Sequence, residues 1–243
     1  MNATVANDSD NAWFDYWGHR NVWTDSALWR KQMEVFVRLS SHMMQYARDD
    51  NILDFGCGSG NFAEMMFDKV SSIVCTDVSE HYVSWCQKKF FSVPNVSVVQ
   101  VAPDMSDLSV VGAGFTKVVC LSVIHYFRHL DRVAAFVRGM QQVCAPGAKL
   151  LIADVGNNRH TWKDKLDTLS FILRERMFLQ ASSIFGKTWL FDVKYRTIRD
   201  RTGYLEIPDG YFQSLAKSLG VKATILETQL TLNANHQNVL IEL

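Results

Sequence analysis

The 243-residue sequence has no net charge, only four prolines, and no apolar stretch that approaches the length of a membrane helix. Balanced charge argues against a general electrostatic attraction to nucleic acid or to acidic membranes. A membrane-spanning helix needs about 20 consecutive apolar residues, so none is predicted. The first ten residues are polar and lack the charged and then apolar pattern of a signal peptide. These absences predict a soluble, cytoplasmic protein without a membrane or nucleic-acid partner.

Cysteine pairs with ligand-like spacing are also absent. The five cysteines include no Cys-x-x-Cys pair. Cys75, Cys120 and Cys144 lie in or beside apolar runs, which predicts buried, reduced thiols. We therefore predict no metal site.

The sequence does contain an α/β alternation of short apolar strands and helices, in a length that suits one domain. Strands are predicted at residues 52–55, 73–76, 96–101, 116–121 and 149–155, with helices after Gly60 and at 80–90 and 130–144. Such alternation indicates a parallel sheet with helices on both faces. Near the end, a helix capped by Asp209 and ended by Gly220 precedes strands at 223–231 and 237–243. Their short connection predicts an antiparallel hairpin.

Two segments interrupt this pattern. Residues 11–47 are rich in tryptophan, and residues 157–203 are expected to form a long helix from about Trp162 to Ile184, followed by an irregular or strand-like piece. We predict an N-terminal helical lid at 1–47, a core at 48–156 and 205–243, and a helical insertion at 157–204 that serves as a substrate-binding cap. Residues 157–201 carry ten basic and five acidic residues. This excess fits an anionic substrate or a phosphate-bearing carrier, or simply a solvated basic face.

The glycine-rich run from Asp54 to Gly60 connects a predicted strand to a helix. Glycines in such a turn let the backbone approach a ligand closely. The spacing is Gly-x-Gly-x-Gly, whereas a dinucleotide site has Gly-x-Gly-x-x-Gly. The carboxylate of Asp54 suits a cationic ligand better than a pyrophosphate. Asp77 ends the second strand, where a carboxylate can accept hydrogen bonds from ribose hydroxyls.

Four stretches resemble the motifs of class I S-adenosylmethionine-dependent methyltransferases of the small-molecule type. They are residues 52–60, 76–79, 115–126 and 145–154. The resemblance implies a Rossmann-like, seven-stranded, mostly parallel sheet with helices on both faces and one antiparallel strand near the edge. It also implies S-adenosyl-L-methionine as the cofactor.

The resemblance carries cofactor-binding roles to particular positions. Gly56, Cys57 and Gly58 would line the methionine part of the cofactor, and Asp54 would help to hold its amino group. Asp77 would bind the ribose, and Val78 would pack on the adenine. Leu121 and Ser122 would line the region around the sulfonium. Phe55 and Tyr126 complete this set. Where relatives carry an acidic residue for the adenine amino group, this sequence has Ala102-Pro103, so either Asp104 or backbone groups would make that contact.

Candidate chemical groups meet where parallel strands end at one edge of the sheet. His125 is the candidate general base because imidazole titrates near neutral pH, and the alternative is a histidine that shapes its loop. Asp154 would orient a base or a substrate amine, or form a simple strand-end turn. Candidate substrate-binding residues, from segments that can cover the site, are Tyr16, Trp23, His160 and Tyr204.

The predicted function is methyl transfer to oxygen or nitrogen of a small-molecule acceptor, for which the basic insertion allows an anionic group. Alternatives are an RNA or protein methyltransferase, a cofactor-binding protein without catalysis, and a nicotinamide oxidoreductase. Balanced charge argues against RNA. The loop after the fourth strand also lacks the Asn-Pro-Pro-Tyr type of signature seen in amino-group methylation of bases or glutamine. We expect a monomer or a homodimer.

Overall fold

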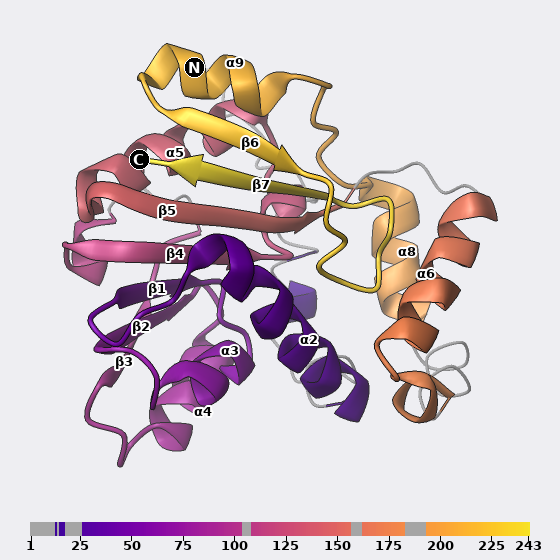
Figure 1. Cartoon of the computed structure of the whole chain (residues 1–243), viewed down its shortest axis with the longest axis horizontal. Helices are drawn as coiled ribbons and strands as arrows, with labels where there is room; N and C mark the ends of the chain where they lie inside the picture. Colours follow the sequence, from indigo (N-terminus) through magenta and orange to yellow (C-terminus); the bar gives the residue numbers. More distant parts are fainter. Residues whose placement is uncertain (1–12, 14, 18–25, 104–107, 157–161, 183–192) are drawn as a thin grey trace, which may run out of the picture.

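The computed structural model describes residues 13, 15–17, 26–103, 108–156, 162–182 and 193–243 (Figure 1). Within these ranges, no helix is both long and apolar enough to cross a membrane. The same ranges contain no group of three or more histidine, cysteine or acidic side chains arranged to hold a metal ion.

Seven strands form one sheet in the order β3-β2-β1-β4-β5-β7-β6. The strands are β1 (Asn51–Phe55), β2 (Ser72–Asp77), β3 (Val96–Gln100), β4 (Phe115–Leu121), β5 (Cys144–Val155), β6 (Lys222–Leu226) and β7 (Gln237–Glu242). Strands β1 to β5 pair in parallel, and β7 is antiparallel to both of its neighbours, β5 and β6. The predicted sheet, with one antiparallel strand next to the edge, is confirmed.

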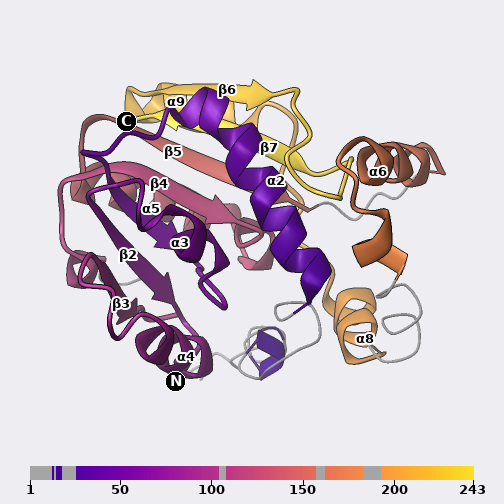
Figure 2. The same ribbon diagram turned by 60° about the horizontal axis from the view of Figure 1, so that its bottom comes forward.

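Helices cover both faces of this sheet (Figures 1 and 2). They are α2 (Ala27–Met44), α3 (Asn61–Met66), α4 (Glu80–Lys89), α5 (Leu130–Val143), α6 (Trp162–Arg174), α8 (Val193–Thr202) and α9 (Tyr211–Leu219), with short 3-10 turns η1 (Ser109–Val111) and η2 (Ile124–Tyr126). Helices α5 and α9 pack on one face, and α2, α3 and α4 on the other. Helices α6 and α8 lie beyond the ends at which the parallel strands finish (Figure 1).

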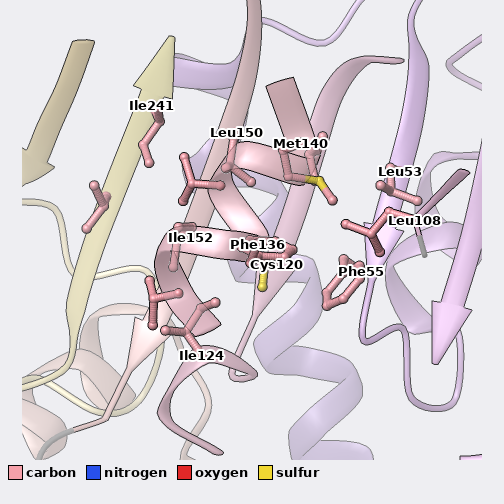
Figure 3. Close-up of a cluster of buried hydrophobic side chains, with 14 of the residues drawn as sticks. Leu53, Phe55, Leu108, Cys120, Ile124, Phe136, Met140, Leu150, Ile152 and Ile241 are labelled. Carbon is pink, nitrogen blue, oxygen red and sulfur yellow. The ribbon is translucent and has the colours of Figure 1, made fainter. Parts of the chain in front are cut away.

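The two faces bury separate hydrophobic clusters because neighbouring strand residues point to opposite sides. On the α5 face, Leu53 and Phe55 of β1 pack with Phe136 and Met140 (Figure 3). On the other face, Ile52 joins a second cluster with residues of α2 and α3. Cys75 and Cys120 are buried, as predicted, whereas Cys144 is only half-buried where α5 meets β5. This double burial fixes the strand ends that carry the candidate site.

Helix α2 links the core to the insertion. Its Met33 and Phe36 belong to the cluster on the sheet, while Leu28 and Val35 pack against Phe171 of α6. The division into lid, core and cap therefore stays a prediction, with α2 contacting both core and cap.

Several predicted elements were wrong in extent or type. The helix from Trp162 ends at Arg174 because Arg176 adopts the left-handed conformation and Met177 N–H bonds to the Ile172 carbonyl at 2.8 Å. The piece predicted as irregular or strand-like contains α8, which turns Ile198 into an aromatic cluster.

Two further corrections concern the closing part of the chain. Asp209 does not cap α9, which begins after a left-handed Gly210 without a side-chain cap. Strand β6 ends at Leu226, so residues 227–236 form a connection longer than predicted. That connection turns inward and buries Leu230 and Thr231.

Candidate functional site

The glycine turn after β1 is held tightly against β2. The N–H groups of Gly56 and Cys57 both donate to the Thr76 carbonyl, at 2.8 and 2.9 Å. Gly56 has a φ of 76°, and a Cβ there would come within 2.3 Å of Val123. Gly60, also left-handed, would bring a Cβ within 2.7 Å of Phe90. Only glycine fits these two positions, so the turn keeps its backbone close to the end of the sheet.

Asp54 lies at the end of β1 with 4% of its surface exposed. Among the described residues, its Oδ2 atom has no hydrogen-bond partner. Burial, followed by the charge of Asp77, raises the pKa of Asp54 to about 7. A buried carboxylate with an unsatisfied oxygen fits a ligand that brings a positive charge.

Asp77 ends β2 and holds the glycine turn from the other side. Its Oδ2 accepts a hydrogen bond from Gly58 N–H and its Oδ1 one from Ser79 N–H, each at 2.9 Å. Burial raises the pKa of Asp77, while these backbone donors favour its charged form. Each carboxylate oxygen keeps a further lone pair for a ligand hydroxyl. The structure thus brings together Asp54, Gly56, Gly58 and Asp77, four of the residues for which a cofactor contact was predicted.

Two residues of the predicted cofactor set turn their side chains elsewhere. Phe55 packs in the core against Phe136, with ring centroids 4.8 Å apart (Figure 3). The Cys57 thiol lies 4.0 Å from that of Cys86, in the cluster on the opposite face. A cofactor contact by either residue would therefore involve its backbone. Val78 and Leu121 are half-buried at the strand ends.

Ser122, directly after β4, and Asp154, near the end of β5, form a hydrogen bond. Asp154 is buried, and its Oδ1 also accepts from His236 Nδ1 at 2.8 Å. His236 was not predicted, because a strand assigned through Thr231 left no reason to turn the following residues toward the site. The mostly polar stretch 233–237, interrupted by Ala234, was the sequence signal for this contact.

His125 is buried, with 3% of its surface exposed, in the turn η2. Its Nδ1 accepts a hydrogen bond from Gly156 N–H at 3.2 Å, and its carbonyl accepts one from Leu205 N–H at 2.9 Å. Burial lowers the pKa of His125 to about 3, although the charge of Asp154 and a hydrogen bond to its backbone act in the opposite direction. The ring is therefore neutral and fixed to the end of β5.

Six aromatic side chains from three segments gather beside His125, and we call this group the aromatic cluster. It consists of Trp13, Tyr16, Trp17, Tyr126, Tyr195 and Tyr204. The ring of Trp13 lies 4.8 Å from that of Tyr126 and 6.0 Å from that of Tyr204. Predicted residues Tyr16, Tyr126 and Tyr204 thus meet, and the hydroxyl groups of Tyr195 and Tyr204 form a hydrogen bond.

The aromatic cluster contains one unsatisfied donor. The indole Nε1 of Trp17 is buried and has no hydrogen-bond partner in the described parts of the chain. Trp13 and Trp17 were visible in the sequence as part of a tryptophan-rich segment, but no spacing set them apart from ordinary packing residues. The predicted residues Trp23, Asp104 and His160 lie outside the described residues.

Comparisons with known proteins agree with this geometry. Residues 52–147 match a family described as a methyltransferase domain. Chondramide synthase of Chondromyces crocatus is 27% identical over 148 residues, which cover 59% of this chain and 4% of that protein. An uncharacterised methyltransferase of Schizosaccharomyces pombe is 27% identical over 123 residues, 48% of this chain and 42% of that protein. The chain therefore spans less than half the length of either curated relative.

A solved structure shares the fold over nearly the whole chain. The N-methyltransferase NodS from Bradyrhizobium japonicum, in complex with S-adenosyl-L-homocysteine, has a TM-score of 0.57 and 15% identity and covers 97% of both chains. The family match, the sheet order and the glycine turn confirm the class predicted from the sequence. This chain contains a methyltransferase domain with the class I, S-adenosylmethionine-dependent architecture.

Proposed function

We propose that this protein transfers a methyl group from S-adenosylmethionine to an oxygen or nitrogen atom of a small-molecule acceptor. The observation that carries the proposal is the Asp54 carboxylate, which is buried and has an unsatisfied Oδ2 among the described residues. Leaving a buried acceptor unpaired costs about 1–3 kcal/mol or more. The ammonium group of the cofactor is a cation that removes this cost.

The other residues at the strand ends fit the rest of the cofactor. Asp77 has lone pairs for ribose hydroxyls, and the space beside Gly58 is open, since a Cβ there would meet no atom within 4 Å. When bound, the cofactor supplies a methyl group that is already activated by a positively charged sulfur. The protein then mainly has to align the acceptor and exclude water, and orientation alone can account for roughly 7–11 kcal/mol of a barrier.

The aromatic cluster is the proposed acceptor site. Its rings offer flat apolar surfaces, and the Trp17 N–H is a buried donor that an acceptor oxygen would satisfy. Burial raises the pKa of Tyr204, whereas the positive charge of Arg199 on α8 acts in the opposite direction. Arg199, which also pairs with Asp200 at 3.0 Å, is the described cation that supports an acceptor with an anionic group. Five unpaired cysteines fit a reducing compartment, so we place this activity in the cytoplasm, in a monomer or homodimer.

Calorimetric titration with S-adenosylhomocysteine and with NAD tests the cofactor. We expect micromolar binding of the first and none of the second, and the opposite result would overturn the proposal. Transfer of labelled methyl groups to panels of small hydroxyl and amine compounds, RNA and proteins then tests the acceptor class. Transfer to RNA or protein alone would replace the small-molecule proposal. Binding without transfer to any panel would favour a cofactor-binding protein without catalysis.

A further inference from the structure

Two non-glycine residues with left-handed backbone conformations lie side by side, one directly after β4 and one near the end of β5, just before Val155. Ser122 has a φ of 58° and Asp154 a φ of 59°. The pairing of β5 with β7 also shifts register between Ile152 and Val155, so Asp154 lies in an irregular part of the ladder. Bulges re-aim side chains, and strained backbones persist where the surroundings hold them, often near functional sites. Here both features direct the Asp154 carboxylate toward the connection between β6 and β7.

The Asp154 carboxylate accepts hydrogen bonds from four side chains. The donors are Ser122 Oγ, Thr231 Oγ1 at 2.6 Å, Asn233 Nδ2 at 3.1 Å and His236 Nδ1 at 2.8 Å. Burial raises the pKa of Asp154, but His236 and these hydrogen bonds lower it more, so the net shift is below the ordinary range. The group is therefore an anion that can only accept hydrogen bonds.

An ionised Asp154 determines which nitrogen of His236 carries hydrogen. Whenever the ring of His236 is uncharged, Nδ1 must be the donor to this anion, and Nε2 then carries the lone pair. Nε2 forms no hydrogen bond with any residue that the structure describes. The side chain of His236 is 7% exposed, which shields it from bulk water. A histidine whose tautomer is fixed by a buried carboxylate, with the far nitrogen unbound, has the arrangement of a general base.

The ring of His236 lies on the acceptor side of the site. Its centroid is 6.1 Å from that of His125 and 6.4 Å from that of Tyr204, a member of the aromatic cluster. The titratable groups that face it are Asp154, His125 and Tyr204, and the charge of Arg199 reaches Tyr204 from α8. His125 cannot take the same role in this arrangement, because its Nδ1 already accepts from the backbone and its proton is on Nε2.

We propose that Nε2 of His236 is the general base that removes the acceptor's proton, and that Asp154 is its positioning residue. This inference rests on the methyltransferase function proposed above. Nε2 bonds to the acceptor proton, and the electron pair of the broken O–H or N–H bond stays on the acceptor atom. That atom bonds to the methyl carbon as the methyl–sulfur pair returns to sulfur. The acceptor is therefore a hydroxyl or protonated amine, since a tertiary amine or thioether has no proton to lose.

The test compares the unsubstituted protein with variants of His236 and Asp154, using the exposed His42→Gln on α2 as the control. His236→Gln is expected to lower kcat about 10²–10⁴-fold and to remove the acidic limb of the kcat/KM profile. Its affinity for S-adenosylhomocysteine stays within twofold, and added imidazole restores part of the activity of His236→Ala. Asp154→Asn is expected to lower kcat more than it changes the acceptor KM, because it removes the anion that fixes Nδ1 of His236 as the donor. The ¹⁵N NMR spectrum is expected to place the hydrogen of His236 on Nδ1.

His236→Gln with more than half the original kcat would overturn the base assignment, as would a hydrogen on Nε2. Methyl transfer by the unsubstituted protein would leave the proposed function intact in either case. If His236→Gln does not fold, the tautomer measured in the unsubstituted protein decides the assignment. Absence of both S-adenosylhomocysteine binding and methyl transfer in the unsubstituted protein would overturn the proposed function, and the base with it.

Discussion

Asp54 and Asp77 lie at the carboxyl ends of the adjacent parallel strands β1 and β2, and the glycine turn follows the first of these strands. Burial, together with the charge of Asp77, raises the pKa of Asp54 to about 7. Asp77 accepts hydrogen bonds from the backbone N–H groups of Gly58 and Ser79, whereas Oδ2 of Asp54 has no partner among the described residues. Because their hydrogen bonding differs, we infer different roles for the two carboxyl groups. Asp77 holds the glycine turn, and Asp54 is the proposed partner of the cofactor's ammonium group.

Replacing Asp54 by asparagine is expected to stabilise the free protein and to abolish cofactor binding. Because the folded state raises the pKa of Asp54, ionisation in the unfolded state lowers the free energy of unfolding as the pH rises from about 4 to about 7. Asp54→Asn removes this penalty, so at pH 8 the Tm rises on the order of 5–10 °C. Thermal unfolding and calorimetry with S-adenosylhomocysteine measure both effects. The exposed Asp68→Asn changes the net charge equally and should show neither.

The same carboxyl group makes cofactor affinity depend on pH. Below pH 7 the cationic cofactor has to displace the proton of Asp54, so each unit of decreasing pH weakens binding roughly tenfold. Above pH 7 the carboxylate is already charged and the affinity reaches a plateau. Titrations with S-adenosylhomocysteine between pH 5.5 and 8 measure this slope. Equal affinity at both ends of the range would exclude Asp54 as the ammonium partner.

Asp77→Ala is expected to weaken cofactor binding about 10-fold to 100-fold or more. The substitution removes charge-assisted hydrogen bonds worth about 1.5–3 kcal/mol each and releases Gly58 N–H from its acceptor. Asp77→Asn keeps one acceptor oxygen for the glycine turn and should recover stability more than affinity. Unchanged affinity in Asp77→Ala, measured by calorimetry, would refute the ribose assignment.

The fold was predictable because its signals are local. Apolar strands at regular distances, and a glycine turn between β1 and α3, specify a parallel sheet and its functional edge. The errors fall where tertiary contacts decide the structure. Helix α8 is polar over most of its length and is placed by Ile198 in the aromatic cluster. Strand β6 ends at Leu226, and the chain then turns inward and buries Leu230 and Thr231. Residues 223–231 look like one continuous strand in the sequence, so this turn could not be predicted.

Contacts in the candidate site could be predicted only between residues that belong to the same sequence motif. Asp54 and Asp77 flank one β-α-β unit, so their proximity follows from the parallel pairing of β1 with β2. The contact of Asp154 with His236 joins positions 82 residues apart in the chain. It depends on the conformation of the connection before β7, for which the sequence has no repeating pattern. His125 had the more recognisable position, directly after β4, but its hydrogen bonds fix it to the backbone.

Trp17→Phe tests the acceptor site by removing an N–H while keeping an aromatic ring. If the buried Nε1 donates to the acceptor, the acceptor KM should rise about 5-fold to 13-fold, because a net hydrogen bond contributes about 1–1.5 kcal/mol. Cofactor affinity should not change. Steady-state kinetics with varied acceptor give the value, and Trp85→Phe on the exposed side of α4 is the matched control. A KM equal to that of the control would remove Trp17 from the acceptor site.

His125→Ala separates the two roles of this histidine. In the structure, the ring fills a buried space and accepts from Gly156 N–H, so its loss should lower the free energy of unfolding by about 2–4 kcal/mol. A decrease in Tm on the order of 5–15 °C is expected, with the acidic limb of the kcat/KM profile retained. His129→Ala, an exposed histidine four residues away, should change neither. A stable His125→Ala protein whose kcat falls about 10²–10⁴-fold, with that limb lost, would instead make His125 the base. Low thermal stability with a normal pH profile would assign the proton transfer to another group, for which His236 has the required geometry.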